Sequence, residues 1–355
     1  MSGATCNDYK GDHMQTIWKL FLAAGIALSV MGLDSWAADY PKMKLRYTNL
    51  APQKMPNSNV DIFMAQELTR RTNGRVQVEI FHGRTLGKPK EILDLVSSGA
   101  VDIGNIAFGF FFSQMPMCTF FNTPMIYKDH IMAAKLSKLG YQTRKSVQQD
   151  MQRNNLHPLI FRALTQYRII SKKPIRTLSD FKGLKVRTFG AVNPIMFKAL
   201  GAVPVTMVPH EAYEALKHGT IDAVFFPWAA AYAFKFHEVA RYISNANFGA
   251  IVGYMTFINL DMWRSWPREL QELSRQIALE AEQLSIKIVG ESDQKALDSM
   301  LAAGAQLVHF QEQEQLERAL PDTIALVQQR VARVGAQYVE PAQKYADFLR
   351  AKLSK

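Results

Sequence analysis

Cysteine is almost absent from the chain, which has only Cys6 and Cys118 among its 355 residues. Because Cys6 lies in a segment upstream of an export signal described below, Cys118 has no partner for an intrachain disulfide, and one thiol cannot build a cysteine metal site. The eight histidines contain no pair at metal-ligand spacing. We therefore expect no disulfide and no metal site, and we expect Cys118 to be a small buried apolar residue.

Catalytic and nucleotide-binding motifs are also missing. The sequence contains no Gly-x-Ser-x-Gly, no phosphate-binding loop and no Gly-x-Gly-x-x-Gly after a predicted strand. These are the common local patterns of an activated serine and of phosphate binding. Nothing in the sequence therefore favours an enzyme, and we expect no cofactor.

Acidic residues are outnumbered by basic ones, 31 against 42, which gives a formal net charge of +11. The basic residues are scattered, and no run is longer than Lys172-Lys173 or Arg70-Arg71. Nucleic-acid-binding proteins concentrate their basic residues in a patch or stripe, so we expect no nucleic-acid partner. A scattered positive surface raises the local concentration of anions.

The N-terminal apolar stretch is too short for a good membrane span. It runs from Leu20 to Leu33, follows Lys19, and is followed by Ser35-Trp36-Ala37. This order is typical of an export signal, with small residues where the signal peptidase cuts. We expect residues 1–37 to be upstream residues plus a cleaved signal peptide, with the true start at Met14. An uncleaved N-terminal anchor is the alternative.

Strand and helix patterns alternate along the chain. Val76, Val78 and Ile80 alternate with polar residues, which predicts a strand, and Ile92 and Val96 follow at helical spacing. Further strands are predicted at 44–50, 101–106, 159–163, 184–187, 203–208 and 221–226, with helices at 193–200 and 211–218. This alternation favours an α/β fold with parallel sheets. A helix of about 35 residues is predicted from Pro267, and another helical stretch at 313–352.

A single arginine stands at the end of one predicted strand. Leu184–Arg187 follows a glycine turn, and the next strand begins near Val203 after a short helix. In open α/β sheets, ligands bind beyond the carboxyl ends of the strands. A guanidinium offers two parallel donors that match a carboxylate. The position and chemistry of Arg187 therefore predict a carboxylate-binding site.

The motifs around Arg187 resemble those of solute-binding proteins of tripartite ATP-independent periplasmic (TRAP) transporters, the DctP family. The resemblance covers most of residues 42–320 and rests on Gly74–Val76, Leu86-Gly87, Gly99–Gly104, Gly183–Arg187, Ala199–Ala202, Tyr213–Leu216 and Gly219–Asp222. It implies a two-lobed periplasmic binding protein fold with a ligand cleft between the lobes and a long helix spanning both. The lobes are expected at 38–164 with 253–292, and at 165–252 with 293–355.

The resemblance also implies what the protein does. A member of this family captures an organic acid in the periplasm and delivers it to the small and large membrane subunits of a TRAP permease. The arginine that matches Arg187 binds the carboxylate in the family, and we expect a monomer. The alternatives are a periplasmic enzyme that processes carboxylates, for which the nearest acid or base is His210, a scaffold, and a protein that signals to a sensor kinase.

Two positions near Arg187 depart from the family pattern. Many relatives carry a second arginine where this chain has Tyr167, with Arg168 one residue later, and many carry an asparagine where this chain has Phe226. A shift of one residue on a strand reverses the face, so Arg168 lines the cleft or lies on the surface.

Aromatic and amide residues complete the candidate site. Phe226, Trp228, Phe189 and Phe108 lie on loops that should converge on Arg187, and their apolar rings favour an apolar or aromatic monocarboxylate. A C4-dicarboxylate or a sugar acid is the alternative ligand. Asn49 and Asn105 end two strands, where they either bind a substrate oxygen or cap the turns that follow.

Overall fold

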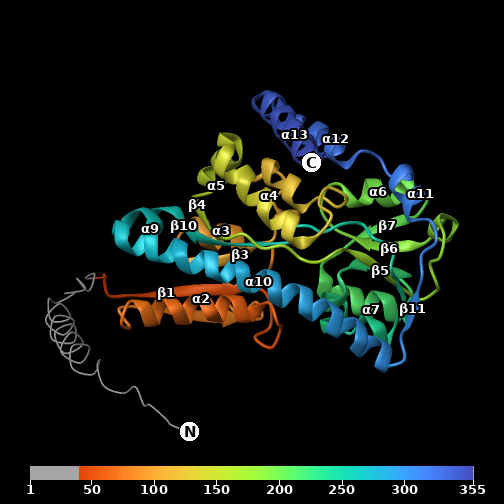
Figure 1. Cartoon of the computed structure of the whole chain (residues 1–355), viewed down its shortest axis with the longest axis horizontal. Coiled ribbons are helices and arrows are strands. Elements are labelled where there is room, and N and C mark those ends of the chain that lie inside the picture. Colours follow the sequence, from red (N-terminus) through yellow and green to blue (C-terminus); the bar gives the residue numbers. More distant parts are fainter. Residues whose placement is uncertain (1–39, 355) are drawn as a thin grey trace, which may run out of the picture. The chain divides into compact units, whose positions relative to one another are not determined.

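The computed structural model describes residues 40–354 (Figure 1). The predicted signal peptide lies outside these residues. In the described part, no helix has both the length and the apolar character that a membrane span requires. Two sheets, rather than one, organise this part of the chain.

The first sheet has five strands in the order β2-β1-β3-β10-β4. β1 pairs in parallel with β2 and β3, whereas β10 is antiparallel to β3 and β4. Pro158 lies within β4, and the edge position of this strand tolerates a residue without an N–H group. The bounds are β1 Met43–Asn49, β2 Val76–His82, β3 Ile103–Ile106, β10 Met255–Asn259 and β4 Leu156–Ile160.

The second sheet has six strands in the order β11-β9-β5-β8-β6-β7. β6 is parallel to β7 and β8, and β5 is antiparallel to β8 and β9. The bounds are β11 Gln306–Val308, β9 Tyr242–Ser244, β5 Arg168–Ser171, β8 Ala223–Phe226, β6 Lys185–Thr188 and β7 Val203–Thr206. The three-residue strands β9 and β11 were not predicted, and neither were β5 and β10. The two-sheet α/β architecture confirms the predicted fold class.

Helices cover both sheets. α2 (Ser58–Arg71), α3 (Ile92–Ser97) and α9 (Leu260–Ser265) belong to the first sheet, and α6 (Asn193–Ala199), α7 (Ala212–Lys217) and α8 (Trp228–Ala233) to the second. α4 (His130–Thr143) and α5 (Lys145–Arg153) precede β4. Asp129 caps α4 by accepting a hydrogen bond from the Met132 amide at 2.8 Å.

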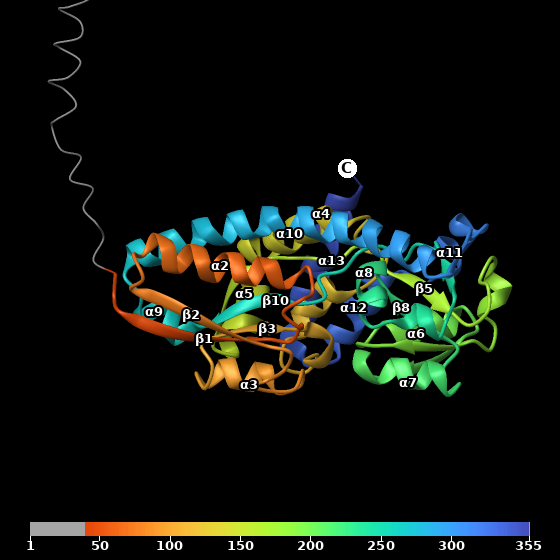
Figure 2. The same cartoon turned by 90° about the horizontal axis from the view of Figure 1, so that it is seen from below.

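The long helix is α10, Arg268–Ala302, which has 35 residues as predicted. It packs against α2 beside the first sheet and against α8 beside the second, and Figure 2 shows it running along both. It ends before Gly304, which has a φ of +90°. Glycine adopts this backbone conformation with little strain because it has no Cβ. Because α10 touches both halves, it confirms the predicted spanning helix.

The predicted helical stretch 313–352 was wrong as a single unit. The structure has three helices there, α11 (Gln313–Ala319), α12 (Thr323–Ala332) and α13 (Val339–Leu353). Pro321 and Gly335 lie in the two breaks, where a missing N–H group and a flexible backbone end helices. α12 packs on residues 116–122, and Tyr345 of α13 packs on Phe120, with 4.9 Å between their ring centroids.

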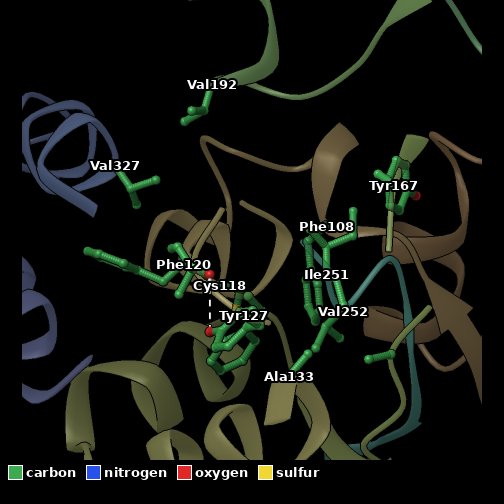
Figure 3. Packing of buried hydrophobic residues seen from close by; sticks show 14 of the residues in the cluster. Phe108, Cys118, Phe120, Tyr127, Ala133, Tyr167, Val192, Ile251, Val252 and Val327 are labelled. Carbon is green, nitrogen blue, oxygen red and sulfur yellow. Dashed lines mark hydrogen bonds between the residues drawn. The ribbon is translucent and has the colours of Figure 1, made fainter. Parts of the chain in front are cut away.

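Buried aromatic residues fill the core that these C-terminal helices cover (Figure 3). Phe120 and Tyr127 are both fully buried, and the Tyr127 hydroxyl donates to the Phe120 carbonyl oxygen at 3.3 Å. Cys118 lies in the same cluster with no exposed surface, and burial raises the pKa of its thiol. The prediction of a small buried apolar residue is confirmed.

The chain passes between the sheets at three places. Residues 161–167 lead from β4 to β5, residues 245–254 lead back from β9 to β10, and α10 leads to β11. Two antiparallel bridges, Tyr127 with Ala250 and Leu164 with Ile251, hold the crossing segments. The predicted boundaries between the lobes, after residues 164, 252 and 292, fall within these three connections. The exact boundaries stay a prediction.

Candidate functional site

Residues from both sheets line a cavity of about 290 Å³. On the side of the first sheet, the loop after β1 supplies Leu50, Pro52 and Met55. On the side of the second sheet, the ends of β6 and β8 supply Arg187 and Phe226. The cavity lining also includes Asn49, Arg84, Asn105, Phe110, Tyr167, Phe189, Pro209, His210, Ala230, Phe234 and Tyr254.

Arg187 is the buried cation of this cavity. It lies on β6, is 2% exposed, and its Nε donates to the Met207 carbonyl oxygen at 3.0 Å. No carboxylate within residues 40–354 forms a salt bridge with it. Burial lowers the pKa of Arg187 to about 10, although the nearby Tyr167 acts in the opposite direction. A buried guanidinium without an acidic partner is costly, and an anion in the cavity would relieve that cost.

Aromatic rings surround the guanidinium. Cζ of Arg187 lies 4.4 Å from the ring centroid of Phe226 and 5.0 Å from that of Phe189. Tyr167 packs on both rings, with centroids 6.4 Å from Phe226 and 5.6 Å from Phe189. Rings stabilise a cation through their negative faces but offer no hydrogen bonds to its N–H groups. The η nitrogens of Arg187 therefore keep donor capacity for a ligand.

Tyr167 and Arg168 lie on different sides of the second sheet, as the alternation of a strand requires. Tyr167 lines the cavity. The Arg168 guanidinium instead lies 4.3 Å from the Trp228 ring centroid, and its Nη1 donates to the Asn245 carbonyl oxygen at 2.8 Å. Arg168 is thus partly buried in a packing role, which is neither of the two positions that the sequence suggested.

Two predicted aromatic residues lie outside the cavity lining. Trp228 begins α8 and stacks with Arg168, while the following residues Ala230 and Phe234 reach the cavity. Phe108 is 2% exposed and packs edge-on against Phe121 in the core, with 5.8 Å between centroids. Its neighbour Phe110 takes the position in the cavity wall.

Asn49 and Asn105 line the cavity, but other protein groups occupy their amides. Asn49 Oδ1 accepts from the Ala51 amide at 2.9 Å and from Asn105 Nδ2 at 3.1 Å, and Asn49 Nδ2 donates to Asp61 at 2.8 Å. Asn105 Oδ1 accepts from the Tyr47 hydroxyl at 2.8 Å and from Arg162 at 2.9 Å. An amide has four hydrogen-bonding sites, so little capacity remains for a substrate oxygen.

A buried ion pair between Asp61 and Arg162 lies behind these asparagines. Arg162 is 3% exposed and its Nη2 bonds to Asp61 and to the Thr256 hydroxyl. Burial opposes the charge of Arg162, but the Asp61 carboxylate outweighs this and raises its pKa. Burial, followed by the charge of Asp61, raises the pKa of Tyr47. This network ties α2 and three strands of the first sheet into a rigid wall.

Sequence reasoning missed several lining residues. Tyr254, Arg84 and His210 all belong to the cavity. His210 had been noted only as the nearest acid or base to Arg187. The left-handed backbone at Gly83 and Arg84, with φ of +68° and +71°, marks a tight turn after β2 that the Gly-Arg pair alone does not reveal.

Within residues 40–354, no group of three or more histidine, cysteine, aspartate or glutamate side chains is placed so that it could hold a metal ion. Two sheets bridged by a long helix, with a cationic pocket between strand ends, are the architecture expected of a solute-binding protein. The family model described as "Bacterial extracellular solute-binding protein, family 7", DctP, matches residues 48–328. The chain belongs to this family, whose members bind solutes for TRAP transport rather than catalyse reactions.

Curated relatives agree with this assignment. The 2,3-diketo-L-gulonate-binding periplasmic protein YiaO of Escherichia coli is 27% identical over 292 residues, covering 80% of this chain and 83% of the relative. The C4-dicarboxylate-binding periplasmic protein DctP of Rhodobacter capsulatus is 26% identical over 323 residues, covering 89% and 93%. The predicted periplasmic location is confirmed.

Solved structures share the fold. A TRAP solute-binding protein from Roseobacter denitrificans with bound β-D-glucuronate has a TM-score of 0.73 at 22% identity, covering 85% of this chain and 99% of that one. Another from Chromohalobacter salexigens with bound D-glucuronate has a TM-score of 0.74 at 20% identity, covering 85% and 99%. At these identities the likeness concerns the fold and not the ligand.

Proposed function

We propose that this protein captures an organic acid through a salt bridge between Arg187 and the ligand carboxylate, and hands the acid to a TRAP permease. The observation that carries the proposal is the buried guanidinium of Arg187 at the cavity, which has no acidic partner in residues 40–354. In a cavity from which water is excluded, such an ion pair is stronger than in solvent. Ligand binding then favours the closed form over the open form.

The cavity wall favours an acid with an apolar or aromatic body. Phe189, Phe226 and Phe234 supply rings, and Leu50 and Met55 supply aliphatic surface. Since the amides of Asn49 and Asn105 are already bonded within the protein, these two side chains offer little to ligand hydroxyl groups. A polyhydroxylated ligand would lose hydrogen bonds to water without replacing them.

A sugar acid is the second candidate, and the comparisons favour it over the apolar acid. Among the solved relatives, one carries β-D-glucuronate and another β-D-galacturonate, and a curated relative is named for 2,3-diketo-L-gulonate. The departures at Tyr167 and Phe226 are the reason to keep the apolar acid, because each replaces a polar group that many relatives carry with an aromatic ring.

Titration calorimetry on the mature chain distinguishes the candidate ligands. The acids to compare are phenylacetate, branched monocarboxylates, dicarboxylates and glucuronate. A ligand present at 100 times its Kd should also stabilise the fold by about 2.7 kcal/mol. We expect Arg187→Ala to weaken binding by a factor of 100 or more and Arg187→Lys to recover little, because an ammonium cannot form two parallel hydrogen bonds.

A matched control is Arg241→Ala, which removes the same charge from an exposed site outside the cavity. Equal affinities of the wild-type chain and Arg187→Ala would overturn the salt bridge. If glucuronate binds and no apolar acid does, the proposed transport function stands, but the ligand is a sugar acid rather than an apolar acid.

A further inference from the structure

A second basic pair lines the same cavity as Arg187. Arg84 Nη1 lies 3.0 Å from His210 Nδ1, in a hydrogen bond in which the guanidinium donates and the imidazole accepts. Arg84 follows β2 of the first sheet, and His210 follows β7 of the second. The two sheets therefore each contribute one basic side chain to this contact.

The positions of the two basic sites differ in burial. Arg187 is 2% exposed, whereas Arg84 and His210 are both exposed residues of the cavity lining. From this difference in exposure we infer that Arg187 lies at the closed end of the cavity and the Arg84–His210 pair at its open end. Apolar lining, including Leu50, Phe110 and Pro209, belongs to the same cavity.

The pair has unused donors. A guanidinium has five N–H groups, and His210, because it accepts at Nδ1, carries its proton on Nε2 when neutral. No carboxylate within residues 40–354 pairs with Arg84. Apart from the bond to His210, the open end therefore presents the donors and the positive charge of Arg84 without a carboxylate partner among residues 40–354, and a carboxylate is the group that best matches a guanidinium.

The backbone under Arg84 supports a specific role for this turn. Arg84 is a non-glycine residue with φ of +71°, in the left-handed region that favours glycine. The turn is held in place because the Gly83 amide donates to the Ala51 carbonyl oxygen at 3.1 Å.

We propose that Arg84, assisted by His210, selects ligands by a second anionic group at their far end. This inference rests on the proposed binding of the first carboxylate by Arg187. It narrows the ligand class to a dicarboxylate whose two carboxylates are separated by an apolar body. The pair acts as a specificity determinant, since a monocarboxylate would leave the donors of Arg84 without a ligand partner.

The test compares acids that differ only at the far end. Calorimetry would measure hexanoate against adipate and octanoate against suberate, with the wild-type chain and with Arg84→Gln, His210→Gln and the control Arg241→Gln. We expect the best-fitting dicarboxylate to bind about tenfold more tightly than its monocarboxylate in the wild-type chain. Arg84→Gln should reduce this ratio to near one, His210→Gln should reduce it less, and Arg241→Gln should keep it.

The outcomes separate the two proposals. If monocarboxylates and dicarboxylates bind equally to the wild-type chain, or if Arg84→Gln keeps the tenfold ratio, the far-end site is wrong while the Arg187 site stands. An equal loss of affinity for both acids in Arg84→Gln would also overturn it, because a contact that only closes the cavity acts on every ligand alike. If neither series binds and glucuronate does, the apolar ligand fails together with this inference.

Discussion

The ring of Phe226 lies against the guanidinium of Arg187, with 4.4 Å between Cζ and the ring centroid. Phe226 ends β8 and Arg187 lies on the neighbouring parallel strand β6, so the strand ends bring them together. This contact stabilises the cation with an aromatic ring. The Phe226 ring shields the guanidinium from water without occupying its hydrogen-bond donors.

Replacing Phe226 tests how the wall sets ligand preference. We expect Phe226→Asn to shift the ratio of affinities for glucuronate and phenylacetate about tenfold toward glucuronate, because the amide offers a donor and an acceptor to hydroxyl groups. Calorimetry with both acids gives the ratio. Phe226→Leu is the matched control, since it keeps an apolar wall without hydrogen-bonding groups, and an equal shift in that variant would contradict the explanation.

The buried pair of Asp61 and Arg162 should matter more for stability than an exposed pair. We expect Arg162→Met to lower the free energy of unfolding by about 3–5 kcal/mol, because it leaves the Asp61 carboxylate buried without a cation. Urea unfolding measures this. The control Arg268→Met breaks an exposed pair with Glu272 and should cost less than about 1 kcal/mol. Similar losses in the two variants would show that the buried network is not structural.

His157 should make the fold sensitive to acid. His157 lies on β4 and stacks on the Trp263 ring, and burial, followed by the charge of Arg275, lowers its pKa to about 4. The unfolded chain binds this proton near pH 6.5, so the stability that neutral His157 provides is present above pH 6.5 and is lost as pH falls toward 4. We expect His157 to account for a decrease of roughly 2 kcal/mol in the free energy of unfolding between pH 7 and pH 5.

Urea unfolding of wild type and His157→Gln at both pH values tests this expectation. The variant should lose less stability on acidification than the wild type. His218→Gln is the control, because His218 is an exposed histidine paired only with Glu214. The explanation fails if His157→Gln and His218→Gln show the same pH dependence as the wild type.

Two helical glycines should respond to alanine with opposite signs. A Cβ at Gly140 of α4 would lie within van der Waals overlap of the Tyr345 ring of α13, with 2.9 Å to Cζ. At Gly290 of α10 the nearest atoms, in the His130 ring, are 3.6 Å away. We expect Gly140→Ala to destabilise by about 1–3 kcal/mol and Gly290→Ala to stabilise by up to about 1 kcal/mol. Thermal unfolding of both variants decides, and stabilisation by Gly140→Ala would show that α13 does not pack on α4 in this way.

Much of the fold follows from local patterns. Leu184–Arg187 was recognisable as a strand because an apolar β-branched run follows a glycine turn, and the helix beginning after Pro267 was recognisable by its spacing. The strands β9 and β11 have only three residues each, which is too short for a periodic signal. They exist because neighbouring strands of the sheet pair with them.

The site was predictable in its position more than in its details. Arg187, Phe189 and Phe226 could be placed from strand ends alone, whereas Trp228 and Phe108 lie outside the cavity lining. Tyr167 and Arg168 could be separated only once their contacts were known. The bonded state of Asn49 and Asn105 depends on Asp61 and Arg162, which are 101 residues apart. No local pattern connects residues at that separation.

The position of Trp228 gives the protein an optical reporter. It begins α8, whose Ala230 and Phe234 line the cavity, and its ring stacks with Arg168. The other two tryptophans of the described part, Trp263 and Trp266, are buried together beside the first sheet. A ligand that moves α8 would therefore change the emission of one indole and leave the other two constant, so the fluorescence of Trp263→Phe/Trp266→Phe would follow the cavity alone.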